Sequence, residues 1–413
     1  MTTLSNTETT TVHDTDEGLL DRVRALAPLL REEAALNEEL RRIPDRSLAA
    51  LEEAGVYRMV TPKHYGGYES SYRTVLDVLA GISAACPGIG WASALSVGGT
   101  WVVARCNDEF QDEVFAENPN ARIPSVFGTF GARAKRVNGG IQVVGGGRWR
   151  FNSGCSTGDW DLLATIVDEP DGSESRVWIA VPMSDLEVLD DWDVMGARGT
   201  GSMGVACGDI RVPDRRVLTR GFDFAAASGD EVESEREFDN PYYNVPAFLV
   251  ANLMICALPI GTAKGALETF LERLPGRAIA YTDYTEASRA PLTHLQVGEA
   301  TLKIAAIEGL MDRHVNAAME WKMGDPGPTP TEMLELQANI SYAFKLAREA
   351  IDLLFLGTGS SVIRDANPIQ RYQRDIQAFS QHPVLHADTL FENLGRVRCG
   401  MKPFGAAAKL ALG

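Results

Sequence analysis

Two aromatic rings and a hydroxyl are spaced two residues apart at Trp149, Phe151 and Ser153, within the run GGGRWRFNSGCSTGDW. Side chains alternate between the two faces of a strand, so a strand here would place all three on one surface. Such a surface suits a planar, partly polar ligand such as a flavin ring, which an aromatic face packs against and a hydroxyl holds at a ring nitrogen. An ordinary strand with aromatic core residues explains the same pattern, so both interpretations stand at this point.

A histidine precedes a proline at His382 and Pro383, inside a segment that is otherwise helical in pattern. The residue before a proline is pushed away from helical geometry, which re-aims its side chain. An imidazole titrates near neutrality and is the commonest general acid or base, and His386 follows four residues later, where it could share the same face. A structural histidine fits equally well, and the six histidines show neither a Ser-His-Asp order nor a metal-ligand spacing.

A third candidate is the run Gly357-Thr-Gly359-Ser360-Ser361. It follows a predicted helix and does not lie between a strand and a helix, so it is neither a dinucleotide-binding fingerprint nor a P-loop. Its backbone N–H groups and hydroxyls could hold a phosphate or a flavin edge. A helix C-cap accounts for the glycines as well.

The spacing of apolar residues, which predicts the helices and strands that position these candidates, changes along the chain. Apolar residues recur at helical steps from residue 19, alternate from about residue 121, and return to helical steps from residue 247. The sequence therefore predicts an α+β protein with these parts: a disordered lead-in (1–18), an N-terminal helical domain (19–120), a β domain (121–219), a polar connecting loop (220–246) and a C-terminal helical bundle of four-helix type (247–413).

Within this outline, local signals predict several elements. Asn138-Gly139-Gly140 is typical of a hairpin turn, and Thr329, Pro330 and Glu332 form the start signal of a long helix. A last helical stretch is expected over 375–397, interrupted by Pro383.

Composition excludes several classes of function. A net charge of -17 repels a nucleic-acid backbone. The six cysteines have no zinc or disulfide spacing, so we expect no metal and a reducing cytoplasm. The first residues lack the basic start and apolar run of a signal peptide, and the most apolar stretch, 247–262, contains Asn252, Pro259 and Gly261, which favours a buried helix over a membrane span.

The chain resembles the acyl-CoA dehydrogenase superfamily from about residue 20 to 400. The resemblance rests on the order of helical, β and helical domains and on these stretches: Leu51-Glu-Glu-Ala-Gly-Val-Tyr with Thr61-Pro-Lys-His-Tyr-Gly-Gly, Trp149-x-Phe-x-Ser-Gly-Cys, Trp192 to Ser202 closing with Val212-Pro213, and Arg371-x-x-Arg-Asp. Ordinary members carry a catalytic glutamate after the Arg-Asp pair. His382 stands in that neighbourhood here, which is similar to the two-component flavin monooxygenases.

The resemblance implies a role for each matching residue. Phe151 would flank the flavin ring, Ser153, next to Gly154, would hydrogen-bond flavin N5, and Gly128-Thr129 would contact the pyrimidine edge. His382 would be the acid or base near the substrate. The remaining implied flavin contacts, made to a neighbouring subunit or on the phosphate side, are Gly357, Gly359, Ser360, Arg371, Arg289 and Gln296.

The family therefore implies an oxygenase component that uses reduced FMN, with FAD as the other option, and O2 to hydroxylate a small phenolic or polyketide-like aromatic. It would work through a C4a-hydroperoxyflavin, which persists when water is excluded and N5 is hydrogen-bonded. A separate NAD(P)H:flavin reductase and a homotetramer are implied as well. The alternatives are an acyl-CoA dehydrogenase or oxidase with a displaced base, an N- or S-oxygenase on the same fold, and a scaffold protein without activity.

Overall fold

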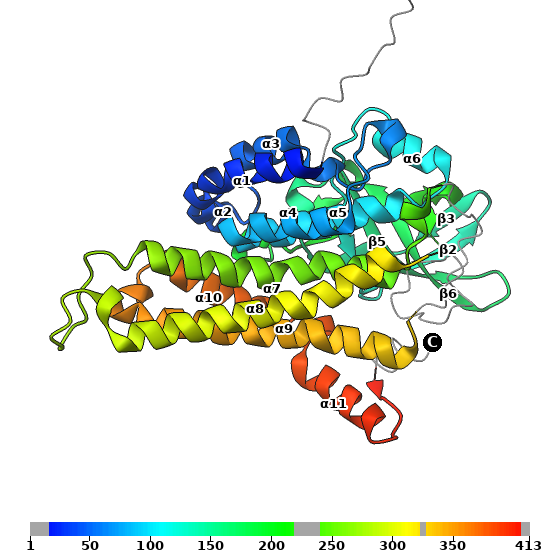
Figure 1. Ribbon diagram of the computed structural model, residues 1–413. Coiled ribbons are helices and arrows are strands. Elements are labelled where there is room, and N and C mark those ends of the chain that lie inside the picture. The colour runs from blue at the N-terminus through cyan, green and yellow to red at the C-terminus, as the bar shows by residue number, and fades with distance from the viewer. Residues whose placement is uncertain (1–15, 219–239, 323–327, 406–413) are drawn as a thin grey trace, which may run out of the picture.

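The computed structural model describes residues 16–218, 240–322 and 328–405. Figure 1 shows the N-terminal helices lying along the long C-terminal helices, with the strands at one end of both. Most of the predicted lead-in (1–18) and of the predicted connecting loop (220–246) lies outside the described residues.

The N-terminal helices surround two apolar ones, α4 and α5. Ser71 caps α4 by accepting from the Thr74 N–H, and α3 ends at Gly55, whose φ of +87° needs a glycine. The short α6 was missed from the sequence, because its signal is little more than the Asn107 cap. The bounds are α1 (Asp16–Glu32), α2 (Ala34–Leu40), α3 (Asp45–Ala54), α4 (Tyr72–Ala85), α5 (Pro87–Val103) and α6 (Asp108–Phe115).

The strands form two sheets. The larger has the order β10-β6-β5-β2-β3-β9, with β1 beside β5, and the smaller has the order β4-β8-β7. The predicted hairpin at Asn138-Gly139-Gly140 is confirmed, since Val137 pairs with Gly140 across it. The bounds are β1 (Ser125–Val126), β2 (Arg133–Val137), β3 (Gly140–Val143), β4 (Gly147–Asn152), β5 (Trp160–Asp168), β6 (Glu174–Pro182), β7 (Glu187–Val188), β8 (Met203–Cys207), β9 (Arg211–Pro213) and β10 (Val217–Leu218).

A β-bulge in β4 overturns the expectation that Trp149, Phe151 and Ser153 share one face. The register with β8 shifts between Trp149 and Asn152, and Phe151 has a φ of +61°. An extra residue in one strand breaks the alternation of faces. Trp149 is therefore fully buried and donates to the Ala164 carbonyl at 2.7 Å, whereas Phe151 is 64% exposed and Ser153 lies in the buried turn beyond the strand.

Four long or medium helices, α7 to α10, pack together as the C-terminal bundle, and α7 also packs on α4. The capping box of Thr329 and Glu332 is confirmed. The predicted stretch 375–397 is wrong at its start, because Asn367 caps a helix that begins at Pro368. The bounds are α7 (Ala247–Glu272), α8 (Pro291–Glu320), α9 (Pro330–Gly357), α10 (Pro368–Phe379) and α11 (Ala387–Arg398).

Helix α7 has the length and apolar composition that could cross a membrane, but 72% of its most apolar window is buried inside the protein. It contacts α4, α5, α8, α9 and α10. These contacts are those of a core helix, as the interrupted apolar stretch predicted.

Candidate active site

Trp91 of α5 joins the two residues that the sequence singled out for chemistry. Its indole Nε1 donates to Ser153 Oγ at 3.0 Å. Its ring stacks on Phe379, with 4.5 Å between centroids, and lies 5.8 Å from the His382 ring. The β domain and the end of α10 thus meet on one tryptophan. Sequence analysis missed this role, although a buried indole N–H needs a partner, and that requirement was the available signal.

The Ser153 hydroxyl begins a chain of hydroxyl groups. Ser153 Oγ lies 2.7 Å from Ser202 Oγ, and Ser202 Oγ lies 2.6 Å from Thr200 Oγ1. Thr200 Oγ1 donates to the Ala197 carbonyl at 2.8 Å. Ser153, Ser202 and Thr200 are all nearly fully buried. The segment from Trp192 to Ser202, which carried part of the resemblance, therefore reaches the candidate site through its hydroxyls.

His382 presents an unpaired ring nitrogen. It precedes the short turn Pro383–Leu385, and its Nδ1 is buried without a hydrogen-bond partner among the described residues. Burial lowers the pKa of His382 to about 4, so the ring is neutral at neutral pH. His386 is exposed and its Nδ1 lies 3.1 Å from Thr389 Oγ1. Of the two histidines, only His382 contacts the ring of Trp91.

Exposed aromatic rings lie beside the Ser153 turn. Phe151 is 64% exposed and Phe130 48% exposed, with 6.3 Å between their centroids, and Trp192 meets Phe151 edge-on at 6.1 Å. Phe130 and Phe151 both have positive φ, a strained state that is concentrated at functional sites. A Cβ on Gly128 would lie 2.6 Å from the Phe130 ring, so a side chain there would require this exposed ring to shift.

These features fit a flavin ring. The exposed aromatic faces can pack against a planar heterocycle, and the Ser153 hydroxyl can bond a ring nitrogen. The His382 ring, whose Nδ1 has no partner among the described residues, lies 5.8 Å from the Trp91 ring and could meet a second polar ligand. The predicted contacts Gly128 and Thr129 lie on the same segment as Phe130, so the structure brings them to the neighbourhood of Phe151.

Three of the remaining predicted residues lie together at the end of α9. A Cβ on Gly357 would be 2.6 Å from Gln296 Oε1, and a Cβ on Gly359 would be 3.3 Å from Arg277 Nη2. Ser360 is exposed beside them. Arg277, which no motif in the sequence marks, has a pKa that is lowered by burial and by the neighbouring cation Arg273. An anion such as a phosphate would relieve both effects.

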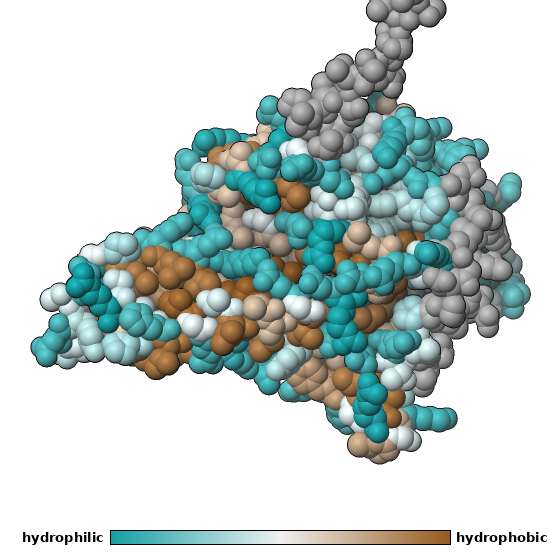
Figure 2. Space-filling model, in the orientation of Figure 1, coloured by the Kyte–Doolittle hydropathy of each residue, from teal (hydrophilic) through white to brown (hydrophobic). Residues whose placement is uncertain are grey.

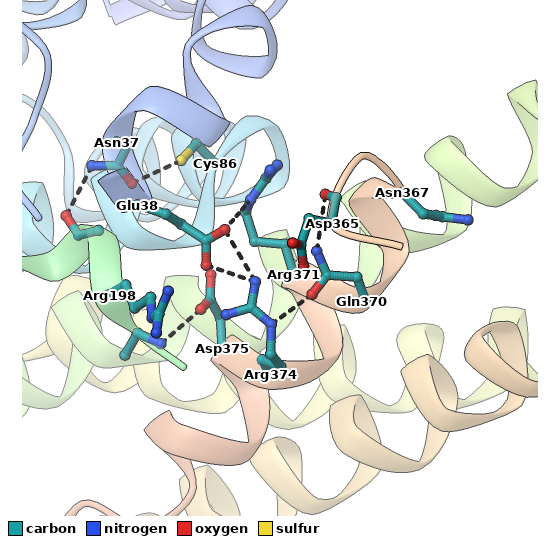
Figure 3. Close-up of polar contacts among 12 residues, drawn as sticks. Asn37, Glu38, Cys86, Arg198, Asp365, Asn367, Gln370, Arg371, Arg374 and Asp375 are labelled. Atoms are coloured by element: carbon teal, nitrogen blue, oxygen red, sulfur yellow. Dashed lines mark hydrogen bonds and ion pairs between the residues drawn. The ribbon is translucent and has the colours of Figure 1, made fainter. Parts of the chain in front are cut away.

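The two predicted arginines, Arg289 and Arg371, form ion pairs within the chain. Arg289 is highly exposed and pairs with Glu286 at 3.0 Å. Arg371 Nε donates to Glu38 at 2.9 Å, and Arg374 reaches the same carboxylate at 2.8 Å (Figure 3). Neither Arg289 nor Arg371 is hydrogen-bonded to Ser153 or His382.

A buried carboxyl next to this pair holds the hydroxyl-bearing loop. Asp375 accepts from the Ala197 N–H at 2.7 Å, and Arg374 donates to the Met195 carbonyl at 2.8 Å. Asp375 is 2% exposed, and burial together with the nearby Glu38 raises the pKa of its carboxyl to about 7. Figure 3 shows Glu38, Arg374 and Asp375 converging beside the segment that contains Arg198. Helix α10 therefore fixes the loop that supplies Thr200 and Ser202.

Comparisons with known proteins show the family and the fold of the chain. Residues 253–387 match the family model described as "Acyl-CoA dehydrogenase, C-terminal domain". The oxygenase subunit HsaA of a flavin-dependent monooxygenase from Rhodococcus jostii (strain RHA1) is 31% identical over 92% of this chain and 98% of its own. The oxygenase component of a FADH2-dependent resorcinol hydroxylase from Rhizobium sp. (strain MTP-10005) is 28% identical over 94% of this chain and 95% of its own. Among solved structures, XiaF from Streptomyces sp., in complex with FADH2 and glycerol, superposes with a TM-score of 0.83 at 26% identity, covering 94% of this chain and 97% of its own.

Proposed function

The chain belongs to the family of flavin-dependent monooxygenase oxygenase subunits, and from this premise we propose that it hydroxylates a small aromatic substrate with reduced flavin and O2. It is an oxidoreductase, and its reduced flavin comes from a separate NAD(P)H:flavin reductase. The observation that supports the proposal is Trp91, whose indole Nε1 donates to the Ser153 hydroxyl and whose ring centroid lies 5.8 Å from that of His382. A flavin at the first and a phenol at the second would lie within one site.

The flavin, when bound, supplies the chemistry that activates O2. This chain supplies the platform. Phe151 would pack against the ring, Ser153 with the adjacent Gly154 would meet N5, and Gly128 with Thr129 would contact the pyrimidine edge. Burial of Ser153 and Trp91 excludes water from the side of the ring that they face.

His382 orients the substrate and draws its proton. Because burial keeps the ring neutral, with a pKa of about 4, Nδ1 would accept from a phenolic O–H in the tautomer that carries its hydrogen on Nε2. Full proton transfer from a phenol to so weak a base is unfavourable in the ground state. The transfer becomes favourable as the substrate ring attacks and the O–H grows more acidic, which is general-base assistance in the transition state.

We assign FMN as the working flavin, with FAD as the alternative. The cluster of Gln296, Gly357, Gly359 and Ser360, together with Arg277, would hold the phosphate end of a flavin from a neighbouring subunit. Arg289 and Arg371 would also contact the flavin of a neighbouring subunit in the assembled oligomer. FAD extends further along the protein than FMN, so the affinity ratio of the two flavins reports on this part of the proposal.

A homotetramer is part of the same proposal. Helix α8 exposes Leu292, Leu295 and Leu302, and the segment after α9 exposes Ile363, with 61%, 72%, 72% and 79% of each accessible. Figure 2 shows hydrophobic residues running along the bundle helices. Exposed apolar patches of this kind mark protein interfaces. A cytoplasmic location completes the proposal, because the six cysteines are all free.

Anaerobic titration followed by a substrate panel tests the function. Reduced FMN should bind, and O2 should then yield a hydroxylated product from a phenol with one O2 consumed per product. Failure to bind any flavin would overturn the proposal. Bleaching of bound FAD by an acyl thioester would show that the protein is an acyl-CoA dehydrogenase. Oxygen transfer to an amine or a thioether, and not to a phenol, would show that it is an N- or S-oxygenase.

A further inference from the structure

The hydroxyl chain at the candidate site has a direction. It runs from the Trp91 indole through Ser153, Ser202 and Thr200 to the Ala197 carbonyl. An indole N–H only donates and a carbonyl only accepts, so the two ends of the chain are fixed in role. Each hydroxyl between them has a single hydrogen to give.

Counting hydrogens gives one arrangement in which every donor has an acceptor. Trp91 donates to Ser153, Ser153 to Ser202, Ser202 to Thr200, and Thr200 to the Ala197 carbonyl. Reversing the hydroxyls would point the Ser153 hydrogen out of the chain, with no protein acceptor for it among the bonds of the described residues. An unmet buried donor carries a desolvation cost, so the forward direction is preferred. Hydrogen bonds that all run one way also polarise and strengthen one another.

The acceptor at the end of the chain is held rigidly. Ala197 has a φ of +57°, which is strained for a residue with a side chain, and Asp375 fixes its N–H at 2.7 Å. Its carbonyl also receives Trp192 Nε1 at 3.1 Å and the Thr200 N–H at 3.2 Å. The Thr200 hydroxyl makes the shortest of the three contacts, at 2.8 Å.

Ser153 Oγ therefore has a free lone pair that can accept a hydrogen bond from a ligand, but it has no free hydrogen to donate. Its hydrogen is given to Ser202, and one of its lone pairs receives Trp91. The N5 of a reduced flavin carries a hydrogen and donates, whereas the N5 of an oxidised flavin has a lone pair and accepts. Only the reduced form complements Ser153 as the chain orients it.

We propose that Ser202 and Thr200 are positioning residues that make the site select reduced over oxidised flavin, by fixing the direction of the Ser153 hydroxyl. The proposal rests on the proposed function, since it needs a flavin N5 at Ser153. It goes further, because it assigns redox selectivity to two hydroxyls that touch the flavin only through Ser153.

The test measures dissociation constants of oxidised and anaerobically reduced FMN for the full-length protein. Ser202→Ala frees the Ser153 hydrogen to donate to an oxidised N5, and Thr200→Val lets Ser202 donate back to Ser153 with the same effect. In both variants, the ratio of the dissociation constant of oxidised FMN to that of reduced FMN should fall on the order of tenfold. The midpoint potential of bound FMN should fall by about 30 mV for a tenfold change in this two-electron couple.

Conservative and neighbouring variants distinguish an effect of hydrogen-bond direction from a general structural effect of substitution. Ser202→Thr and Thr200→Ser keep the hydroxyls and should keep the wild-type ratio. Ser156→Ala removes a nearby hydroxyl that lies 3.5 Å from Met203 Sδ and outside the chain, and it should also keep the ratio. Circular dichroism and thermal melting confirm that each variant is folded.

The outcomes distinguish this inference from the proposed function. A narrowed ratio in Ser202→Ala and Thr200→Val, restored in the hydroxyl-keeping variants, supports it. An unchanged ratio in both variants, alongside a changed ratio in Ser153→Ala, would leave the flavin contact in place and overturn the directional chain. Unchanged affinities in Ser153→Ala, or no binding of either flavin form by the wild type, would overturn the flavin contact itself.

Discussion

The indole Nε1 of Trp91 donates to Ser153 Oγ at 3.0 Å, across 62 residues of sequence. The same ring stacks on Phe379 and lies beside His382. One side chain of the N-terminal domain thus sets the spacing between a hydroxyl of the β domain and an imidazole of the C-terminal bundle. The relationship makes the site dependent on all three parts of the chain.

Trp91→Phe should keep the ring packing and remove the donor. We expect a loss of about 1 kcal/mol in the free energy of unfolding, the usual contribution of a buried hydrogen bond, measured by chemical denaturation. More hydrogen peroxide should be released per NADH consumed, because Ser153 is no longer held. A variant with wild-type stability and wild-type peroxide release would contradict the role given to this bond.

His382→Gln should lower turnover of a phenol by 10²- to 10⁴-fold while leaving the affinity for reduced FMN unchanged. His386→Gln is the matched control and should turn over normally, because His386 is exposed and its Nδ1 lies 3.1 Å from Thr389 Oγ1. With the pKa of His382 near 4, its protonation should not shape the pH-rate profile between pH 6 and 8. A limb near pH 6.5 that disappears in His382→Gln would refute the buried neutral ring.

Asp161→Asn should stabilise the protein more at pH 8 than at pH 4. Burial raises the pKa of Asp161 to about 7, so the folded protein keeps a proton that the unfolded chain releases near pH 4. Wild-type stability is therefore lost as pH rises from about 4 to 7, by roughly 2 to 4 kcal/mol for this group. Denaturation curves at the two pH values measure the difference, with the exposed Asp193→Asn as control. An equal effect of Asp161→Asn at both pH values would show that the carboxyl is ionised throughout.

Phe151→Leu should weaken FMN binding on the order of tenfold, about 1.4 kcal/mol, by removing an aromatic face. Its effect on the free energy of unfolding should stay within about 0.5 kcal/mol, because the ring is 64% exposed. Phe404→Leu, at an exposed ring on the C-terminal segment, should leave FMN binding unchanged. Equal loss of FMN affinity in both variants would remove Phe151 from the flavin contact.

Leu295→Glu with Leu302→Glu should break the tetramer into smaller species. These leucines lie seven residues apart on α8 and are each 72% exposed, so two charges would occupy the proposed interface. Light scattering after size-exclusion chromatography measures the mass, and Val144→Glu on the β domain is the control. A monomeric wild type, or a tetramer that survives both changes, would rule out this face.

The sequence predicts the features whose signal is local. The Asn138-Gly139 hairpin and the Thr329 capping box each follow from a few adjacent residues, and both are confirmed. The role of His382 stays a prediction, which was made because Pro383 follows it. The bulge in β4 has no signal in the alternation of residue types. The pattern therefore predicted one face for Trp149 and Phe151, whereas Trp149 is buried and Phe151 is exposed.

The contacts that assemble the site are long-range and have no local signal. Trp91 lies in an apolar helix whose residues are nearly all buried, so nothing in its pattern separates it from core residues. The pairing of Glu38 with Arg371 and Arg374 spans more than 330 residues. Only the folded chain shows that two of the residues expected at a flavin are also engaged elsewhere, or that Ser202 reaches Ser153.

The loop from Met195 to Gly201 has consequences for protein engineering. Asn37 of α2 donates to the Gly199 carbonyl at 2.9 Å, and a Cβ on Gly196 would lie 2.2 Å from the Arg374 carbonyl oxygen. The loop thus packs closely against two helices, α2 and α10, that belong to other parts of the chain. A chimaera that exchanges only residues 121–219 between relatives would pair the loop with helices from another protein, so the exchanged unit must include α2 and α10.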